Sequence, residues 1–152
     1  MALVASTLSD LLQSTFRGVD SFAAAAAGWA SAYRTYAQSA QANGVPPVLT
    51  GLEEAVLAGQ LTAAFAALDP NTFPSAFEAA FQAFWLTPPV AFGSGAATLA
   101  PPGLGSLLVS TYPANLVAPT SAAAAINVAA AIDAWTRLVS VTFPGPVVAV
   151  LV

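Results

Sequence analysis

The chain has 152 residues, of which 57% are hydrophobic and 7% charged, and its formal net charge is −4 with three Arg and no Lys, His or Cys. Ordinary soluble domains carry about 25% charged residues. The missing side chains exclude a His-based triad, a Cys nucleophile, a Lys Schiff base and a disulfide framework. Three Arg and a negative net charge also argue against nucleic-acid binding through phosphate contacts.

The stretch from residue 6 to residue 47 predicts one long amphipathic helix that stops at Asn43-Gly44. Thr7 with Asp10 resembles a capping box at its start. Apolar residues recur every three or four positions, and the small ones in the middle allow another helix to approach closely. This stripe consists of Leu8, Leu12, Phe16, Val19, Ala23, Ala26, Ala30, Tyr33, Ala37 and Ala40.

Two shorter helices follow in the predicted order. The first covers about residues 50 to 68 and begins with a capping box formed by Thr50 and Glu53. The second ends near residue 86 and carries a ladder of aromatic residues that step by four, four and three: Phe73, Phe77, Phe81 and Phe84. Because only a short turn separates the two helices, we expect antiparallel packing with this ladder as their shared core.

Gly and Pro interrupt the next segment, residues 87 to 119, for which we expect extended chain and short strands rather than a helix. A fourth helix is predicted after residue 120, with Thr120 or Ser121 as its cap and an Asp133–Arg137 pair one turn apart. The tail from residue 139 to residue 152 predicts a β-strand. Val147 to Val152 carries no charge and needs a neighbouring strand to cover it.

These elements predict an α+β fold, mainly α, with about four helices, an irregular Gly/Pro-rich middle and a C-terminal β-strand. We expect a single domain over residues 1–152. It has a helical part at 1–86, an extended segment at 87–119, and a helix with a strand at 120–152.

The carboxylates give little sign of catalysis or metal binding. Glu53 and Glu54 are sequence neighbours, so on a helix they point about 100° apart, and they are best explained as first-turn acids. Glu78 lies between two Phe of the ladder, where a solvated or capping role is expected. We therefore expect no enzyme activity, no catalytic or metal-binding residue and no cofactor.

An interface between subunits is the kind of site that the apolar residues favour. Trp29 lies on an Ala-rich helix, and Trp is over-represented at the centres of interfaces. The candidate interface residues are Trp29, Phe92, Leu104, Leu107, Leu108, Val147, Val148, Val150 and Val152.

A membrane-spanning segment is not predicted. A spanning helix needs about 20 mainly apolar residues. The best helical candidate runs only from Phe22 to Ala32. Residues 79 to 132 lack charge, but several Pro interrupt them. The start of the chain, MALVASTLSD, has no basic region of the kind that opens a signal peptide.

The second half of the chain, about residues 80 to 150, resembles small virion structural proteins of tailed bacteriophages and phage-like particles. The shared features are an aromatic helix end running into TPPV, a Gly/Pro-rich middle, and an Ala-rich helix ending in AWT before a Val/Thr strand. Ala-rich helices with the pair Gly28-Trp29 are also similar to mycobacterial secreted helical-hairpin proteins. Those proteins have Trp-x-Gly in the opposite order and a tyrosine-acid export signal that this sequence lacks.

The phage resemblance implies a non-enzymatic subunit of a large multi-copy assembly, in a neck, tail, baseplate or capsid-associated position. Its implied partners are copies of itself and other subunits of the same particle, with no nucleic acid, membrane or small-molecule substrate. The implied location is a virion or phage-like particle assembled in the bacterial cytoplasm. The alternatives are a membrane-associated or secreted Ala-rich helical protein and an enzyme that uses carboxylates alone.

Overall fold

The computed structural model describes residues 2–15, 19–116, 120–145 and 147–152, with the side chains of 112–116 left out. This part of the chain contains six helices and a four-stranded antiparallel sheet, so the prediction of a mainly α, α+β fold is confirmed. The helices are α1 (Ala5–Thr15), α2 (Phe22–Ala37), α3 (Leu52–Ala67), α4 (Phe73–Leu86), α5 (Leu104–Leu116) and α6 (Ser121–Thr136). The strands are β1 (Ala91–Phe92), β2 (Gly95–Leu99), β3 (Ser140–Phe143) and β4 (Val147–Val150).

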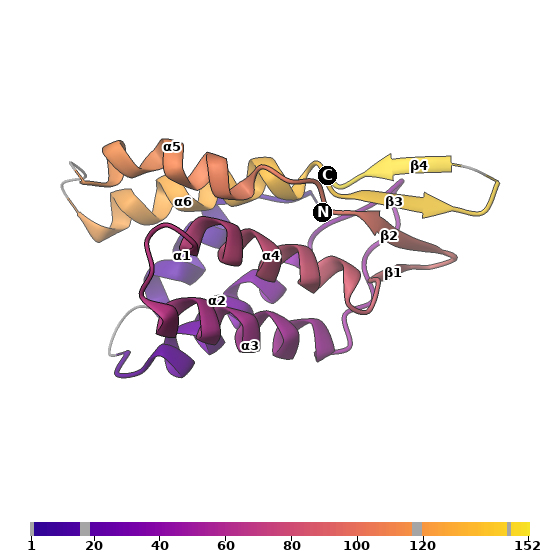
Figure 1. Cartoon of the computed structure of the whole chain (residues 1–152). Helices are drawn as coiled ribbons and strands as arrows, with labels where there is room; N and C mark the ends of the chain where they lie inside the picture. The colour runs from indigo at the N-terminus through magenta and orange to yellow at the C-terminus, as the bar shows by residue number, and fades with distance from the viewer. Residues whose placement is uncertain (1, 16–18, 117–119, 146) are drawn as a thin grey trace.

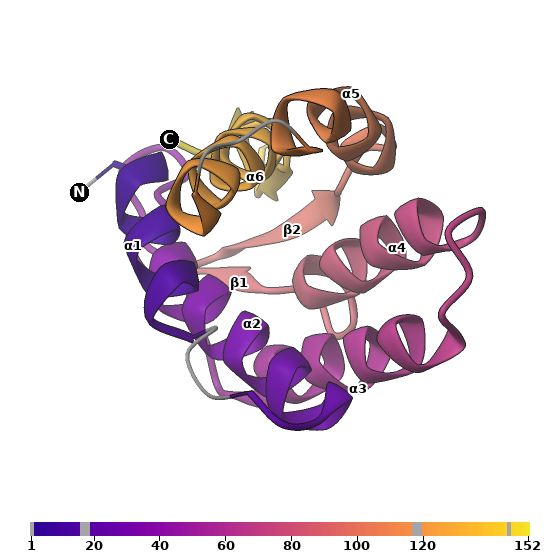
Figure 2. The ribbon, with the colours of Figure 1, turned by 90° about the vertical axis from the view of Figure 1, so that its left-hand side faces the viewer.

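The six helices form a ring around an aromatic core. Each helix packs against the next one in the chain, and α6 returns to pack against α1. Figure 2 shows this ring end-on, with β1 and β2 behind it. The sheet projects from the opposite end of the molecule (Figure 1). The centre of the ring is filled by fully buried large side chains, among them Tyr33, Phe81, Phe84, Trp85 and Trp135.

The prediction of one long N-terminal helix is wrong, because α1 and α2 are separate. Ser21 has extended backbone (φ −150°), and its hydroxyl oxygen accepts the N–H of Ala24 as the N-cap of α2. Helix α1 starts before the predicted Thr7 cap. Leu8 and Leu12 are fully buried as predicted, since α1 packs against both α2 and α6. Phe16, from the same stripe, lies outside the described residues.

Helices α3 and α4 pack together as predicted, but the Phe ladder does more than join them. Phe73 stacks on Phe65 of α3. Phe77 makes an edge contact with Trp29, and Phe81 and Phe84 both contact Tyr33, so these three rings pack against α2. The ladder therefore fills the centre of the ring as well as the α3–α4 contact.

The predicted extended segment 87–119 contains a helix, α5, as well as β1 and β2. Both N–H groups that flank the start of α5, those of Gly103 and Gly105, donate to Oε2 of Glu78 on α4, at 3.0 and 2.8 Å. The prediction failed because Gly105 and Pro113 disfavour a helix locally. Packing against α4 and α6 outweighs that preference.

The C-terminal tail docks within its own chain, and it forms two strands, β3 and β4, instead of the one strand predicted for residues 139 to 152. The sheet order is β1-β2-β3-β4, and β4 pairs with β3 in a hairpin that places Val148 opposite Thr142 and Val150 opposite Ser140. Beyond β4, the backbones of Gln41 and Val152 exchange two hydrogen bonds. The chain thus covers the last part of the outer edge of this apolar strand, which limits edge-to-edge pairing.

We predict that Gly105→Ala lowers the free energy of unfolding by roughly 1–3 kcal/mol, the usual cost of overpacking. A Cβ at this position would lie 2.8 Å from the backbone oxygen of Pro74, and α4 and α5 would have to separate. Gly59→Ala is the matched control: it lies within α3 with open space around it, and should raise stability by about 0.5–1 kcal/mol. Urea unfolding measures both. Equal effects of the two substitutions would show that the α4–α5 approach is not tight.

Candidate binding surfaces

Three of the carboxylates that the sequence analysis discussed, Glu53, Glu54 and Glu78, make contacts with other parts of the fold. Glu53 is 2% exposed, and its Oε2 accepts the N–H groups of Thr50 and Gly51. The predicted capping box is half formed: Glu53 reaches back to the N–H of Thr50, but Gly51 is the N-cap of α3 and has no side chain to cap its first turn. Glu54 lies 3.6 Å from the guanidinium of Arg34, with both side chains partly exposed. Glu78 caps α5, in agreement with its predicted capping role.

Asp133 links α6 to α2 and to the N-terminus. Its carboxylate accepts the hydroxyl of Tyr36 and the guanidinium of Arg137, and Arg137 in turn donates to the carbonyl of Leu3. Burial, together with the bond to Asp133, raises the pKa of Tyr36 far above its usual value, so the phenol stays protonated. The predicted Asp133–Arg137 pair is thus present and belongs to a larger network.

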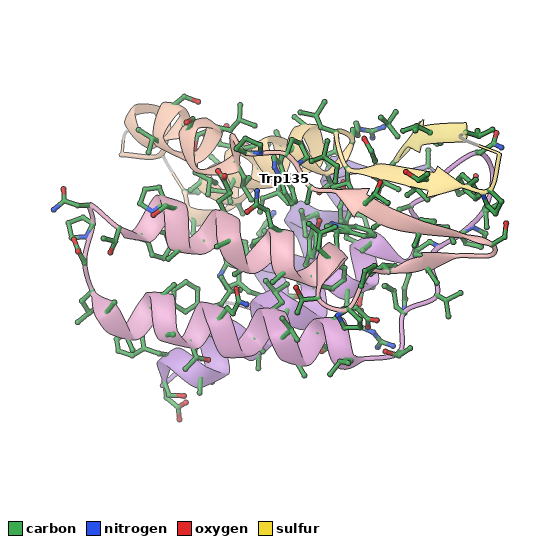
Figure 3. All side chains as sticks on the ribbon, turned by 45° about the vertical axis from the view of Figure 1, so that its right-hand side comes forward. Trp135 is labelled. Carbon is green, nitrogen blue, oxygen red and sulfur yellow. The ribbon has the colours of Figure 1, made fainter. Side chains whose placement is uncertain are left out.

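The hydroxyl of Tyr33 is the centre of a second, fully buried network. The indole N–H of Trp85 donates to it at 2.8 Å, and it shares a hydrogen bond of 2.9 Å with the hydroxyl of Thr136. Burial raises the pKa of Tyr33 well above its usual value. Trp135, labelled in Figure 3, donates its indole N–H to the carbonyl of Pro101. These bonds satisfy the buried hydroxyl and indole groups that they join.

An apolar groove of about 820 Å³ lies between the ends of helices. Its walls come from the start of α2, the end of α3, the start of α4 and the middle of α5. A smaller cavity of about 190 Å³ adjoins it, reaches α6 and shares Trp29, Phe65, Phe73 and Leu108 with the groove. The groove is lined by Phe22, Ala25, Trp29, Ala64, Phe65, Leu68, Asp69, Pro70, Phe73, Pro74, Leu108 and Val109.

Asp69 is the one ionisable residue among those that line the groove. Its Oδ1 accepts the N–H of Asn71 at 2.9 Å, and hydrogen bonds from Asn71 and Thr72 lower the pKa of its carboxyl. The carboxylate is partly exposed at the rim and is ionised at neutral pH. The other lining side chains are aliphatic, aromatic or proline, so the interior of the groove suits an apolar occupant.

A second neutral surface lies on the sheet, on the side opposite to the buried Ala97 and Val141. Successive residues of a strand point to opposite faces, and an irregularity in β2 between Ala97 and Leu99 brings Leu99 opposite Ser140. The pairing thus aligns two rows across three strands. Leu99, Val148 and Val150 are 52%, 63% and 50% exposed. We call this surface the outer sheet face; it consists of Ala96, Leu99, Ser140, Thr142, Val148 and Val150. None of its side chains is charged.

The predicted interface residues fall into three places. Val147, Val148, Val150 and Val152 lie exposed on and after β4, while Trp29 and Leu108 line the groove and Leu107 is half-buried beside it. Phe92 and Leu104 are fully buried within the chain, so a surface role does not fit them. Sequence reasoning missed Phe22, Leu68 and Val109 in the groove, since only the packing of separate helix ends brings them together.

Comparison with known proteins gives no relative: no protein family, curated protein or solved structure matches this chain. Within residues 2–15, 19–116, 120–145 and 147–152, no helix is both long and apolar enough to cross a membrane. The same residues contain no cluster of His, Cys, Asp and Glu that could hold a metal ion.

We predict that Tyr33→Phe lowers the free energy of unfolding by about 1–3 kcal/mol, because it leaves the buried indole N–H of Trp85 without its acceptor. Thr98→Val is the control. It also removes a hydroxyl–hydroxyl bond, the one to Thr142, but at an exposed site, and its effect should stay within about 0.5 kcal/mol. Thermal or urea unfolding compares the two. A cost for Tyr33→Phe no larger than for Thr98→Val would contradict a structural role of the network.

Proposed function

We propose that this protein is a non-enzymatic structural subunit of a large multi-copy assembly, namely a virion protein of a tailed bacteriophage or phage-like particle. In this proposal its partners are copies of itself and other subunits of the same particle. It has a position in the neck, tail, baseplate or capsid-associated layer, and the particle is assembled in the bacterial cytoplasm.

The outer sheet face is the observation that carries the proposal. An antiparallel sheet with one face on the core commonly presents polar and charged side chains to water on its other face. Here that face carries Val148, Val150 and Leu99, with only uncharged Ser and Thr between them. Exposed apolar patches of this kind mark contact sites with other molecules. A neighbouring subunit that covers the face would bury these side chains.

The placement of the charges also supports the proposal. Of the ten charged residues, Glu53, Glu78, Asp133 and Arg137 are engaged in bonds that hold the fold together, which leaves six in 152 residues to keep separate copies apart. The resemblance of residues 80 to 150 to phage virion proteins is the reason for proposing a phage or phage-like particle. It rests on sequence features alone.

The direct test is the state of the purified protein and of the particle that contains it. Native mass measurement and electron microscopy of the expressed chain should give ordered multimers, alone or with the proteins encoded beside it. A chain that stays monomeric at all concentrations and with every neighbouring gene product would contradict the proposal. Binding of that monomer to lipid vesicles would favour the membrane-associated alternative.

We predict that Val148→Asp abolishes assembly while it changes the free energy of unfolding by no more than about 1 kcal/mol. Position 148 is exposed in the single chain, so the Asp carboxylate stays in water and the fold is little affected. A neighbouring subunit that covers the face would have to bury this charge, which is costly. Val148→Thr, which keeps the β-branched shape without charge, should assemble normally. Sedimentation velocity measures assembly and circular dichroism the fold. Normal assembly of Val148→Asp would remove the outer sheet face from the contact.

A further inference from the structure

The groove at the open end of the helical ring has the size and lining of a ligand site. Small-molecule sites occupy about 300–1,000 Å³ and are lined mainly by apolar and aromatic side chains. The groove, at about 820 Å³, lies within this range, and Trp29, Phe65 and Phe73 provide aromatic surface along it. It lies far from the outer sheet face, because the sheet projects from the other end of the molecule (Figure 1).

The shape of the groove favours a slender ligand over the flat surface of another protein. The cavity of about 190 Å³ adjoins the groove, since Trp29, Phe65, Phe73 and Leu108 line both, and it reaches Val128 on α6. An alkyl chain or a ring can lie along these shared side chains. A broad protein surface would contact mainly the rim residues Leu68 and Val109, which are 74% and 56% exposed.

The charges at the rim select the kind of head group. The partly exposed carboxylate of Asp69 repels an anion and attracts a cation. Two helices, α2 and α4, begin at this end, and a helix N-terminus attracts an anion with about half a unit of positive charge. One N–H near each start already has a partner within the chain, since Ser21 accepts the N–H of Ala24 and the carbonyl of Asp69 accepts the N–H of Phe73. The full negative charge of Asp69 exceeds the partial charge of either helix end.

We propose that the groove binds an amphiphile whose apolar body lies against Trp29 and Phe73 and whose head group, beside Asp69, is positively charged. This binding activity is separate from the proposed structural role. The sequence led us to expect no small-molecule substrate; this ligand is bound and not transformed.

The test compares three probes that share a decyl chain and differ in the head group: decyltrimethylammonium, decyl maltoside and decyl sulfate. Isothermal titration calorimetry below the critical micelle concentrations gives each affinity for the full chain. The cation should bind tightest, the neutral probe more weakly and the anion weakest. Equal affinity for cation and anion, or no binding of any probe, would overturn the proposal.

Matched variants separate the site from the general negative charge of the protein. Asp69→Asn keeps an oxygen to accept the N–H of Asn71 and should weaken cation binding about two- to fivefold, the usual range for one exposed charge pair. Asp10→Asn makes the same change in net charge on α1, away from the groove, and should have no effect. Equal weakening by both variants would show that net charge, and not the groove, attracts the probe.

A second pair of variants tests the place of binding. Val109→Trp fills the groove from an exposed position on α5 and should weaken the binding of all three probes about tenfold or more. Ser110 is also exposed but does not line the groove, so Ser110→Trp should bind the probes like the original chain. Unchanged binding to Val109→Trp would place the probes elsewhere and overturn the proposal. If no probe binds but Val109→Trp abolishes assembly, the groove is a subunit contact. Loss of assembly in Val148→Asp with normal probe binding would leave both proposals standing.

Discussion

The hydroxyl of Tyr33 joins three helices at the centre of the molecule, and the ring of helices closes around it. It accepts the indole N–H of Trp85 on α4 and bonds to Thr136 on α6. Edge contacts from Phe81 and Phe84 enclose the phenol ring. An aromatic side chain with its polar tip satisfied contributes both apolar area and a fixed orientation. The helices α2, α4 and α6 do not follow one another in the chain. The bonds of Tyr33 therefore hold together three helices that no single loop connects.

The few charges of the protein stabilise its structure more than its solubility. Glu53 caps α3, Glu78 attaches the start of α5 to α4, and Asp133 with Arg137 ties α6 to α2 and to the carbonyl of Leu3. Each of these groups satisfies backbone or side-chain atoms that would otherwise be buried without a partner. The consequence is a surface with little charge of its own, so contact with other molecules is inexpensive in electrostatic terms.

The long uncharged stretch, residues 79 to 132, is accommodated in two ways. Part of it forms the core, where Phe81, Trp85, Phe92 and Ile132 are fully buried. Another part remains exposed on the outer sheet face and along the groove. The two neutral surfaces lie at different ends of the molecule, so a subunit contact on the sheet and a ligand in the groove are compatible. A long uncharged stretch can therefore exist without being wholly covered by neighbouring subunits.

The sequence by itself determined the elements whose signals are local. The cap Thr120, the Thr50–Glu53 pair, the Phe ladder and the Asp133–Arg137 spacing predicted α3, α4 and α6 correctly, because such signals depend only on nearby residues. The break before α2 and the β3–β4 hairpin also have local causes, the Ser21 cap and the turn at Gly145, which our interpretation of the sequence did not use. Tertiary structure decided the rest. The helix α5 depends on packing against α4 and α6, which overrides local preference. The groove has no local signal at all, since it exists only where the ends of α2, α3 and α4 meet the middle of α5. Nor could the sequence show that Glu53 is buried, because burial depends on what packs over a residue and not on its neighbours in the chain.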